Sequence, residues 1–89
     1  MAWKIEFDRD ARKEFAKLDH QTSRRILKFL IERLAARGNP RELGEALTGS
    51  KFGEFWKYRV GDYRIICRIQ DQEICILVVR IGNRREVYR

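Results

Sequence analysis

Apolar and polar residues alternate at the start of the chain and then take up the spacing of helices. Residues 3–7 place Trp, Ile and Phe on one side and Lys and Glu on the other, as a half-buried strand does. From Asp8 to Gly38, apolar residues recur every three or four positions, which is typical of amphipathic helices. Asp8 and Asp19 are each placed to cap a helix, and Gly38 is placed to end the second one. The pattern therefore predicts a strand followed by a helical hairpin.

Each predicted helix has an apolar stripe that another part of the fold must cover. The stripe of the first helix consists of Ala11, Phe15 and Leu18. Its charged residues are expected in solvent: Arg12, Lys13, Glu14 and Lys17. The second helix has a wider stripe, made of Ile26, Leu27, Leu30, Ile31 and Leu34. Such a hairpin needs a sheet to cover, and we expect the helices on one face of that sheet.

The second half of the chain predicts three strands, at about residues 55–60, 63–70 and 73–81. Gly61 and Asp62 form the turn between the first two, since Gly in the first central position suits a type II′ hairpin. Residues 41–53 are predicted to form a connecting loop with one helical turn, and residues 84–88 a last short strand or extended tail. Residues 1–89 are expected to form one domain.

The predicted hairpin brings two arginines together. Its turn pairs Val60 with Tyr63 and Arg59 with Arg64. The apolar pair suits a core, whereas two arginines directly opposite each other repel and destabilise a hairpin. The neighbouring sequence supplies no counter-ion for them. A polyanion that binds across this face explains the arrangement most simply.

The overall charge also favours an acidic partner. Lys and Arg number 20 against 13 Asp and Glu, a formal net charge of +7, which favours binding to nucleic acid or to an acidic protein. No apolar run approaches the length of a membrane span, and the N-terminus lacks a signal peptide's apolar region. We therefore expect a cytoplasmic protein.

Several kinds of catalytic site are poorly supported. His20 is the only histidine and stands beside a predicted helix cap, so neither a zinc site nor a Ser-His or Cys-His nucleophile is indicated. The glycines are scattered at turns, without a Walker loop or a dinucleotide fingerprint. Cys67 and Cys75 are expected to be inert, half-buried thiols, and the hairpin register decides whether they face each other. No metal or cofactor is therefore expected.

The remaining polar chemistry is a basic group with one tyrosine. Its members are Lys57, Arg59, Arg64, Arg68, Arg84, Arg85 and Tyr88. Such side chains bind phosphates and stabilise the negative charge that develops on a phosphorane. RNA supplies its own nucleophile, the 2′-hydroxyl, so the protein need only move protons and hold the reacting atoms in line. A metal is then unnecessary.

Tyr88 and several of the arginines also have a simpler interpretation. A phenol has a pKa of about 10, which nearby cations would lower, but spacing alone favours a tyrosine packed at the sheet edge. Arg59, Arg68 and Arg85 are interpreted first as a solvated strand face or as electrostatic footing for RNA. We assign these three arginines, together with Lys51, to binding RNA or the ribosome.

Two C-terminal motifs resemble those of a known family. They are WKYRVGDYRII at Trp56–Ile66 and IGNRREVYR at Ile81–Arg89, and together they closely resemble the RelE/ParE family of bacterial type II toxins. The resemblance implies an α+β fold, with an N-terminal strand and helical hairpin packed on one face of a mainly antiparallel β-sheet. It also implies a cognate antitoxin, in a hetero-oligomeric complex, that covers or distorts the active face. RelE-type members cleave mRNA in the ribosomal A site by 2′-hydroxyl attack, whereas ParE-type members poison DNA gyrase.

The resemblance assigns roles to particular residues of this chain. The catalytic lysine, arginines and tyrosine of the nuclease branch match Lys57, Arg64, Arg84 and Tyr88. The two arginines are implied to bind the scissile phosphate, while Lys57 and Tyr88 both remain candidates for the general base. Phe55 stands where RelE has a second lysine. The resemblance favours a ribosome-dependent, metal-independent endoribonuclease that acts on mRNA in the ribosome, with a gyrase inhibitor as the alternative.

Overall fold

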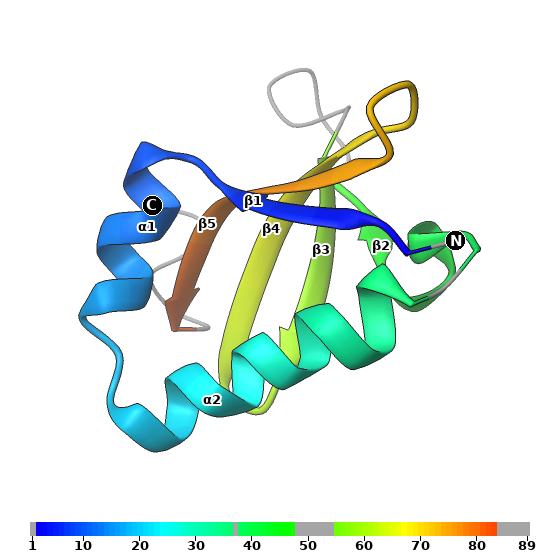
Figure 1. The fold of residues 1–89 in the computed structure, drawn as a ribbon. Coiled ribbons are helices and arrows are strands. Elements are labelled where there is room, and N and C mark those ends of the chain that lie inside the picture. Colours follow the sequence, from blue (N-terminus) through cyan, green and yellow to red (C-terminus); the bar gives the residue numbers. More distant parts are fainter. Residues whose placement is uncertain (1, 37, 48–54, 84–89) are drawn as a thin grey trace.

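The fold is built on a five-stranded sheet with the strand order β1-β5-β4-β3-β2, whose one face is covered by the helices (Figure 1). The computed structural model describes residues 2–36, 38–47 and 55–83. Its elements are β1 (Lys4–Phe7), α1 (Arg9–Ala16), α2 (His20–Lys28), the π-helical continuation η1 (Phe29–Ala35), the 3-10 turn η2 (Pro40–Leu43), β2 (Glu45–Ala46), β3 (Phe55–Val60), β4 (Tyr63–Gln70) and β5 (Cys75–Asn83). β1 is parallel to β5, and the other neighbouring strands are antiparallel. The predicted α+β architecture is therefore confirmed.

Both helices begin at the predicted aspartates. The Asp8 carboxylate accepts a hydrogen bond from the Ala11 N–H at 3.0 Å, and Asp19 accepts one from the Thr22 N–H at 3.2 Å. These bonds satisfy backbone donors that the first turn of a helix leaves without a partner. The Asp8 N–H in turn donates to the Val78 carbonyl at 2.9 Å. The start of α1 is thereby attached to β5.

The second helical segment buries a narrower stripe than its sequence predicts. Ile26, Leu30 and Leu34 are fully buried, whereas Leu27 and Ile31 are 39% and 53% exposed. The prediction for these two residues was wrong because each lies about 100° around the helix from its buried neighbour, and one sheet covers a single side. The helical segment also ends at Ala35 rather than at Gly38. Within the described ranges, no helix is long and apolar enough to cross a membrane.

The predicted hairpin between β3 and β4 is confirmed. Gly61 has a φ of 61° and is the only glycine of the described part with a positive φ, as the first central position of a type II′ turn requires. The register pairs Val60 with Tyr63 and Arg59 with Arg64, as predicted. Both strands also have the predicted bounds.

β5 departs from the prediction in its bounds and in its regularity, and it ends at Asn83, two residues later than predicted. It begins at Cys75, two residues later than predicted, because Ile74 occupies the preceding turn with a positive φ of 49°. It also contains a β-bulge, because Ile66 pairs with Arg80 while the next residue of β4 pairs with Val78. Val79 is therefore an extra residue in β5, and the inward-facing positions shift by one beyond it.

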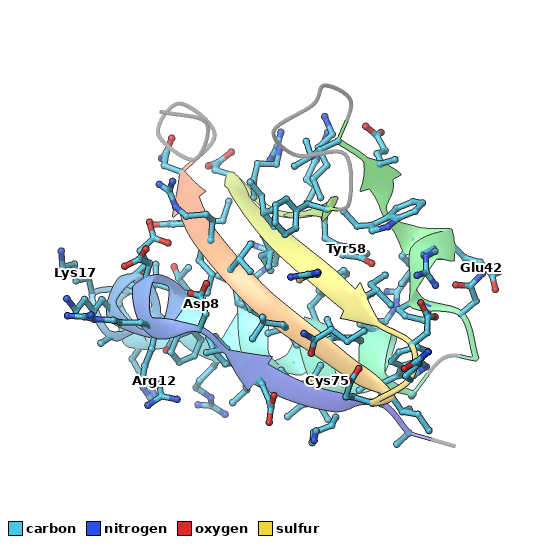
Figure 2. The ribbon with its side chains drawn as sticks, turned by 90° about the horizontal axis from the view of Figure 1, so that it is seen from above. Asp8, Arg12, Lys17, Glu42, Tyr58 and Cys75 are labelled. Atoms are coloured by element: carbon cyan, nitrogen blue, oxygen red, sulfur yellow. The ribbon has the colours of Figure 1, made fainter. Side chains whose placement is uncertain are left out.

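The segment that leads into a missed strand packs against Tyr58, the most buried aromatic residue of the described part. β2 lies within the predicted loop, and its two residues are too few to show an alternating pattern. Tyr58 is only 1% exposed, and its hydroxyl donates to the Pro40 carbonyl at 2.9 Å. A Cβ at Gly44 would lie 2.7 Å from the Tyr58 ring, so glycine permits this close approach. Burial raises the pKa of Tyr58 well above its usual value, and Figure 2 shows this residue between β4 and the segment that holds β2.

Trp56 lies at the rim of the core. It is half-buried, and the Arg41 guanidinium lies 5.8 Å from the centre of its ring. Arg41 also donates two hydrogen bonds to Asp71, at 2.9 and 2.6 Å. This ion pair joins η2 to the turn between β4 and β5. Trp56 faces the helices as its position in the strand predicts, but part of its ring lies against Arg41 and part is exposed to solvent.

The two cysteines are separate, free thiols. Cys67 pairs with Val78 and Cys75 pairs with Gln70, so the two residues do not face each other. Both are fully buried rather than half-buried. Burial raises the pKa of Cys75 to about 11 and moves the pKa of Cys67 further upward. Both thiols are therefore protonated at neutral pH, which agrees with their predicted inertness.

Candidate functional site

The sheet face opposite the helices carries the basic residues of β3 and β4. Tyr58 and Val60 belong to the buried core, so the alternating Lys57 and Arg59 face the other way. The register places Arg64 opposite Arg59 on that face, and Arg68 opposite Phe55. We call Lys57, Arg59, Arg64 and Arg68 the basic face. Period-two alternation predicts this grouping from the sequence, and the structure confirms it.

Lys57 and Arg64 are diagonal neighbours on the basic face. Lys57 pairs with Ile66, two positions after Arg64, and side chains in this relation start about 7–8 Å apart. A hollow of about 190 Å³ lies beside them and is lined by Leu43, Glu45, Lys57, Tyr58, Arg59 and Arg64. On the other side of Arg64, β5 contributes Gly82, which has no side chain at that register. The two cations can therefore reach one bound phosphate.

The charges on this face are only partly neutralised. The Lys57 ammonium lies 3.4 Å from the Glu45 carboxylate, which is strongly exposed. Arg64 donates to the backbone carbonyl of Tyr63 at 3.2 Å. Among the residues that the structure describes, no carboxylate forms an ion pair with Arg59 or Arg64. A bound anion would thus supply the charge that this arginine pair lacks.

Glu45 is a member of the site that the sequence does not reveal. It lies in β2, directly opposite Lys57, and no local pattern marks the strand. A surface ion pair of this kind contributes about 0–1 kcal/mol, so a phosphate can displace the carboxylate from Lys57. Glu45 therefore competes with the anion for this lysine without blocking it.

Four predicted site residues lie outside the described residues. They are Lys51, Arg84, Arg85 and Tyr88. Their roles remain predictions. Arg84, Arg85 and Tyr88 follow β5 in the sequence. The structure places the end of β5, at Asn83, beside the basic face, because Gly82 pairs with Arg64.

Glu14 corrects another expectation, since it does not lie free in solvent. Its carboxylate accepts a hydrogen bond from the Ile81 N–H at 2.9 Å and one from the Arg80 Nε at 3.2 Å. We call these three residues the β5 clasp. Glu14 and Arg80 are far apart in sequence, so periodicity on either element gives no sign of the contact.

In the part of the chain that the structure describes, no three His, Cys, Asp or Glu side chains come together as metal ligands would. The chemistry of the basic face is that of several cations around an exposed hollow. Such an arrangement binds phosphate oxygens and stabilises added negative charge.

Comparison with known proteins identifies the family. The profile of the family described as "ParE toxin of type II toxin-antitoxin system, parDE" matches residues 5–88. The mRNA interferase toxin RelE of Escherichia coli (strain K12) is 31% identical over 90 residues, covering 99% of this chain and 92% of RelE. The chain belongs to the RelE/ParE family of type II toxins.

Solved structures agree with this membership. The toxin–antitoxin complex RelBE2 from Mycobacterium tuberculosis contains a chain that superposes with a TM-score of 0.84 at 22% identity, covering 97% of this toxin and 95% of that chain. At this identity the likeness shows the fold. A chain of the intact Escherichia coli RelBE toxin–antitoxin complex superposes with a TM-score of 0.73 at 26% identity, covering 92% and 96%. The resemblance of the two C-terminal motifs is therefore confirmed as family membership.

Proposed function

We propose that this toxin is a ribosome-dependent endoribonuclease that cleaves mRNA without a metal. The observation that carries the proposal is the basic face, where Lys57 and Arg64 share an exposed hollow and the Arg59–Arg64 pair has no carboxylate partner among the described residues. A relative that is 31% identical is named an mRNA interferase. An inhibitor needs only to dock, whereas cations gathered around a hollow suit phosphoryl chemistry, because they stabilise the negative charge that develops on the phosphate.

The proposed reaction uses the nucleophile that RNA provides. The 2′-oxygen attacks the adjacent phosphorus and loses its proton to a base, for which Lys57 and Tyr88 are the candidates. The bond from phosphorus to the 5′-oxygen breaks, and that oxygen takes up a proton. The products are a 2′,3′-cyclic phosphate and a 5′-hydroxyl. Arg64 and Arg84 would bind the phosphate oxygens as their charge increases.

The ribosome would supply the alignment of the RNA. The described site offers cations but few groups that could orient a flexible single strand, so we expect little activity on naked RNA. Arg59, Arg68, Arg85 and Lys51 would bind the RNA or ribosome backbone. The protein would then act in the cytoplasm, on mRNA in the ribosomal A site.

A translation extract of defined composition tests this proposal. Primer extension should map cuts at codon-associated positions in translated mRNA, and the same mRNA without ribosomes should remain intact. An intact translated mRNA would reject the nuclease assignment. The family profile carries the name ParE, so purified gyrase is the matched second assay. Inhibited supercoiling with uncut mRNA would support the gyrase alternative instead.

Arg64→Ala is expected to reduce the cleavage rate by about 10²-fold or more, the effect of removing one donor to a developing oxyanion. The protein should stay folded, because Arg64 is half-buried on the open face and, among the described residues, donates only to hairpin carbonyls. Arg24→Ala is a matched control on an exposed position of α2. Cleavage rates on programmed ribosomes and thermal melts of the purified proteins measure the two effects, and toxicity in cells should fall with the rate. A large drop in melting temperature for Arg64→Ala would assign it a structural role.

The solved relatives include toxin–antitoxin complexes, which supports a cognate antitoxin as partner. We propose that an acidic or apolar antitoxin segment neutralises the basic face or displaces the tail that carries Tyr88. Electrostatic steering weakens with salt, so the association rate should fall markedly between low and physiological ionic strength. Stopped-flow mixing measures this rate. An association rate that does not change with ionic strength would instead favour docking on the exposed Leu27 and Ile31 of the helical face.

A further inference from the structure

Among the described strands, none pairs with the last part of β5 on the edge that β1 occupies earlier. β1 pairs only with Cys75–Val78, and the chain then leaves the sheet at Asp8. On the opposite edge, β4 remains paired with β5 as far as Asn83. An unpaired backbone donor at a partly buried edge costs free energy unless another group accepts its hydrogen bond.

Beyond the end of β1, the β5 clasp supplies the hydrogen-bond acceptor for this edge of β5. One oxygen of the Glu14 carboxylate accepts the Ile81 N–H at 2.9 Å, and the other lies 3.2 Å from the Arg80 Nε. The side chains of Glu14 and Arg80 are 28% and 34% exposed, so this ion pair is partly shielded from water. Hydrogen bonds to a charged carboxylate are stronger than those between neutral groups.

α1 is consequently bonded to β5 at both of its ends. Asp8, at its start, donates to the Val78 carbonyl, and Glu14, in its last turn, accepts from Ile81. The extra residue Val79 lies between these two attachment points. Figure 1 shows α1 beside the end of β5. The bulged part of β5 is therefore held from the helix side as well as from β4.

We propose that Glu14 is a positioning residue for the reaction of this toxin. Ile81 is one residue before Gly82, which pairs with Arg64, and three residues before Arg84. Three residues span at most about 11 Å, so the point that Glu14 holds lies close in the chain to a proposed phosphate ligand. By fixing the end of β5, Glu14 holds in place, beside Arg64, the point from which the chain continues toward Arg84 and Tyr88. This inference rests on the proposed nuclease function.

Single-turnover cleavage on programmed ribosomes tests the role of Glu14. At saturating toxin, Glu14→Ala should lower the cleavage rate at least tenfold while the concentration for half-saturation changes less than threefold. Glu14→Gln should fall between Glu14→Ala and wild type, because its amide oxygen still accepts the Ile81 N–H. Glu32→Gln, on an exposed position of η1, is the matched control and should cleave at the wild-type rate. A Glu14→Ala rate within threefold of wild type, or a loss confined to binding, would overturn the proposal.

Amide measurements separate this inference from the nuclease proposal. In ¹⁵N-labelled toxin, Glu14→Ala should speed exchange of the Ile81 amide at least tenfold and shift the backbone resonances of residues 84–89, whereas Glu32→Gln should do neither. If wild-type toxin cleaves no translated mRNA, the nuclease proposal fails while these spectra still report the positioning of the segment. Resonances of residues 84–89 that do not move in Glu14→Ala or Glu14→Gln would refute the positioning role whatever the activity.

Discussion

Replacing Tyr88 with phenylalanine is expected to slow cleavage on programmed ribosomes by about 10²–10⁴-fold, the usual range for a general acid or base. The change removes one hydroxyl and keeps the ring, so folding and base stacking should persist. Single-turnover measurements at saturating ribosomes report the chemical step without differences in binding. The measurement thus separates proton transfer from every role that the ring alone can fill.

Tyr63→Phe is the matched control for Tyr88→Phe. Tyr63 is a half-buried tyrosine at the start of β4, outside the proposed machinery, and its variant should cleave like wild type. A Tyr88→Phe rate within about threefold of wild type would exclude proton transfer by Tyr88. Lys57 would then be the remaining candidate base, and Tyr88→Ala would show whether the ring stacks on RNA or packs at the sheet edge.

Tyr58→Ala should be the most destabilising single change of the described core, with a loss of about 3–5 kcal/mol in the free energy of unfolding. Tyr58 is almost wholly buried; its ring lies close to Gly44 and its hydroxyl donates to the Pro40 carbonyl. The free energy of unfolding of a small domain is about 5–15 kcal/mol in total, so this loss is a large fraction of it. Urea unfolding followed by tryptophan fluorescence measures it.

Two further variants divide the contribution of Tyr58. Tyr58→Phe keeps the ring and leaves the Pro40 carbonyl without its donor, which should cost about 1–3 kcal/mol. Trp56→Ala should cost less than Tyr58→Ala, because Trp56 is half-buried and Arg41 lies against its ring. A larger loss for Trp56→Ala than for Tyr58→Ala would contradict the core described here.

Local patterns predict the parts of the fold that depend on neighbouring residues. β3, its turn and β4 follow from period-two alternation and from Gly61, whose positive φ matches the turn type that the sequence favours. The cap at Asp8 follows in the same way, because capping involves residues only three positions apart. The shared face of Lys57 and Arg64 needs only the hairpin register.

Contacts between distant segments could not be predicted. Glu14 contacts Arg80 only because α1 packs beside β5. In the sequence of the helix, nothing distinguishes Glu14 from the other charged residues. Glu45 meets Lys57 only because two residues pair with β3. The exposure of Ile31 depends on how much of the helix one sheet can cover. In each case tertiary packing, rather than local propensity, decides the outcome.

Because of the bulge at Val79, the number of residues in β5 decides which of its later side chains face the core. Val78 faces the core before the bulge and Ile81 faces it afterwards, so the alternation restarts in the opposite phase. Lengthening or shortening this stretch by one residue would move every later side chain of the strand to the opposite face of the sheet. Substitutions here alter packing locally, whereas an insertion or deletion would redirect the path of the chain. Alignments of related toxins therefore need the correct gap at this point before any residue of the C-terminal motif can be equated between them.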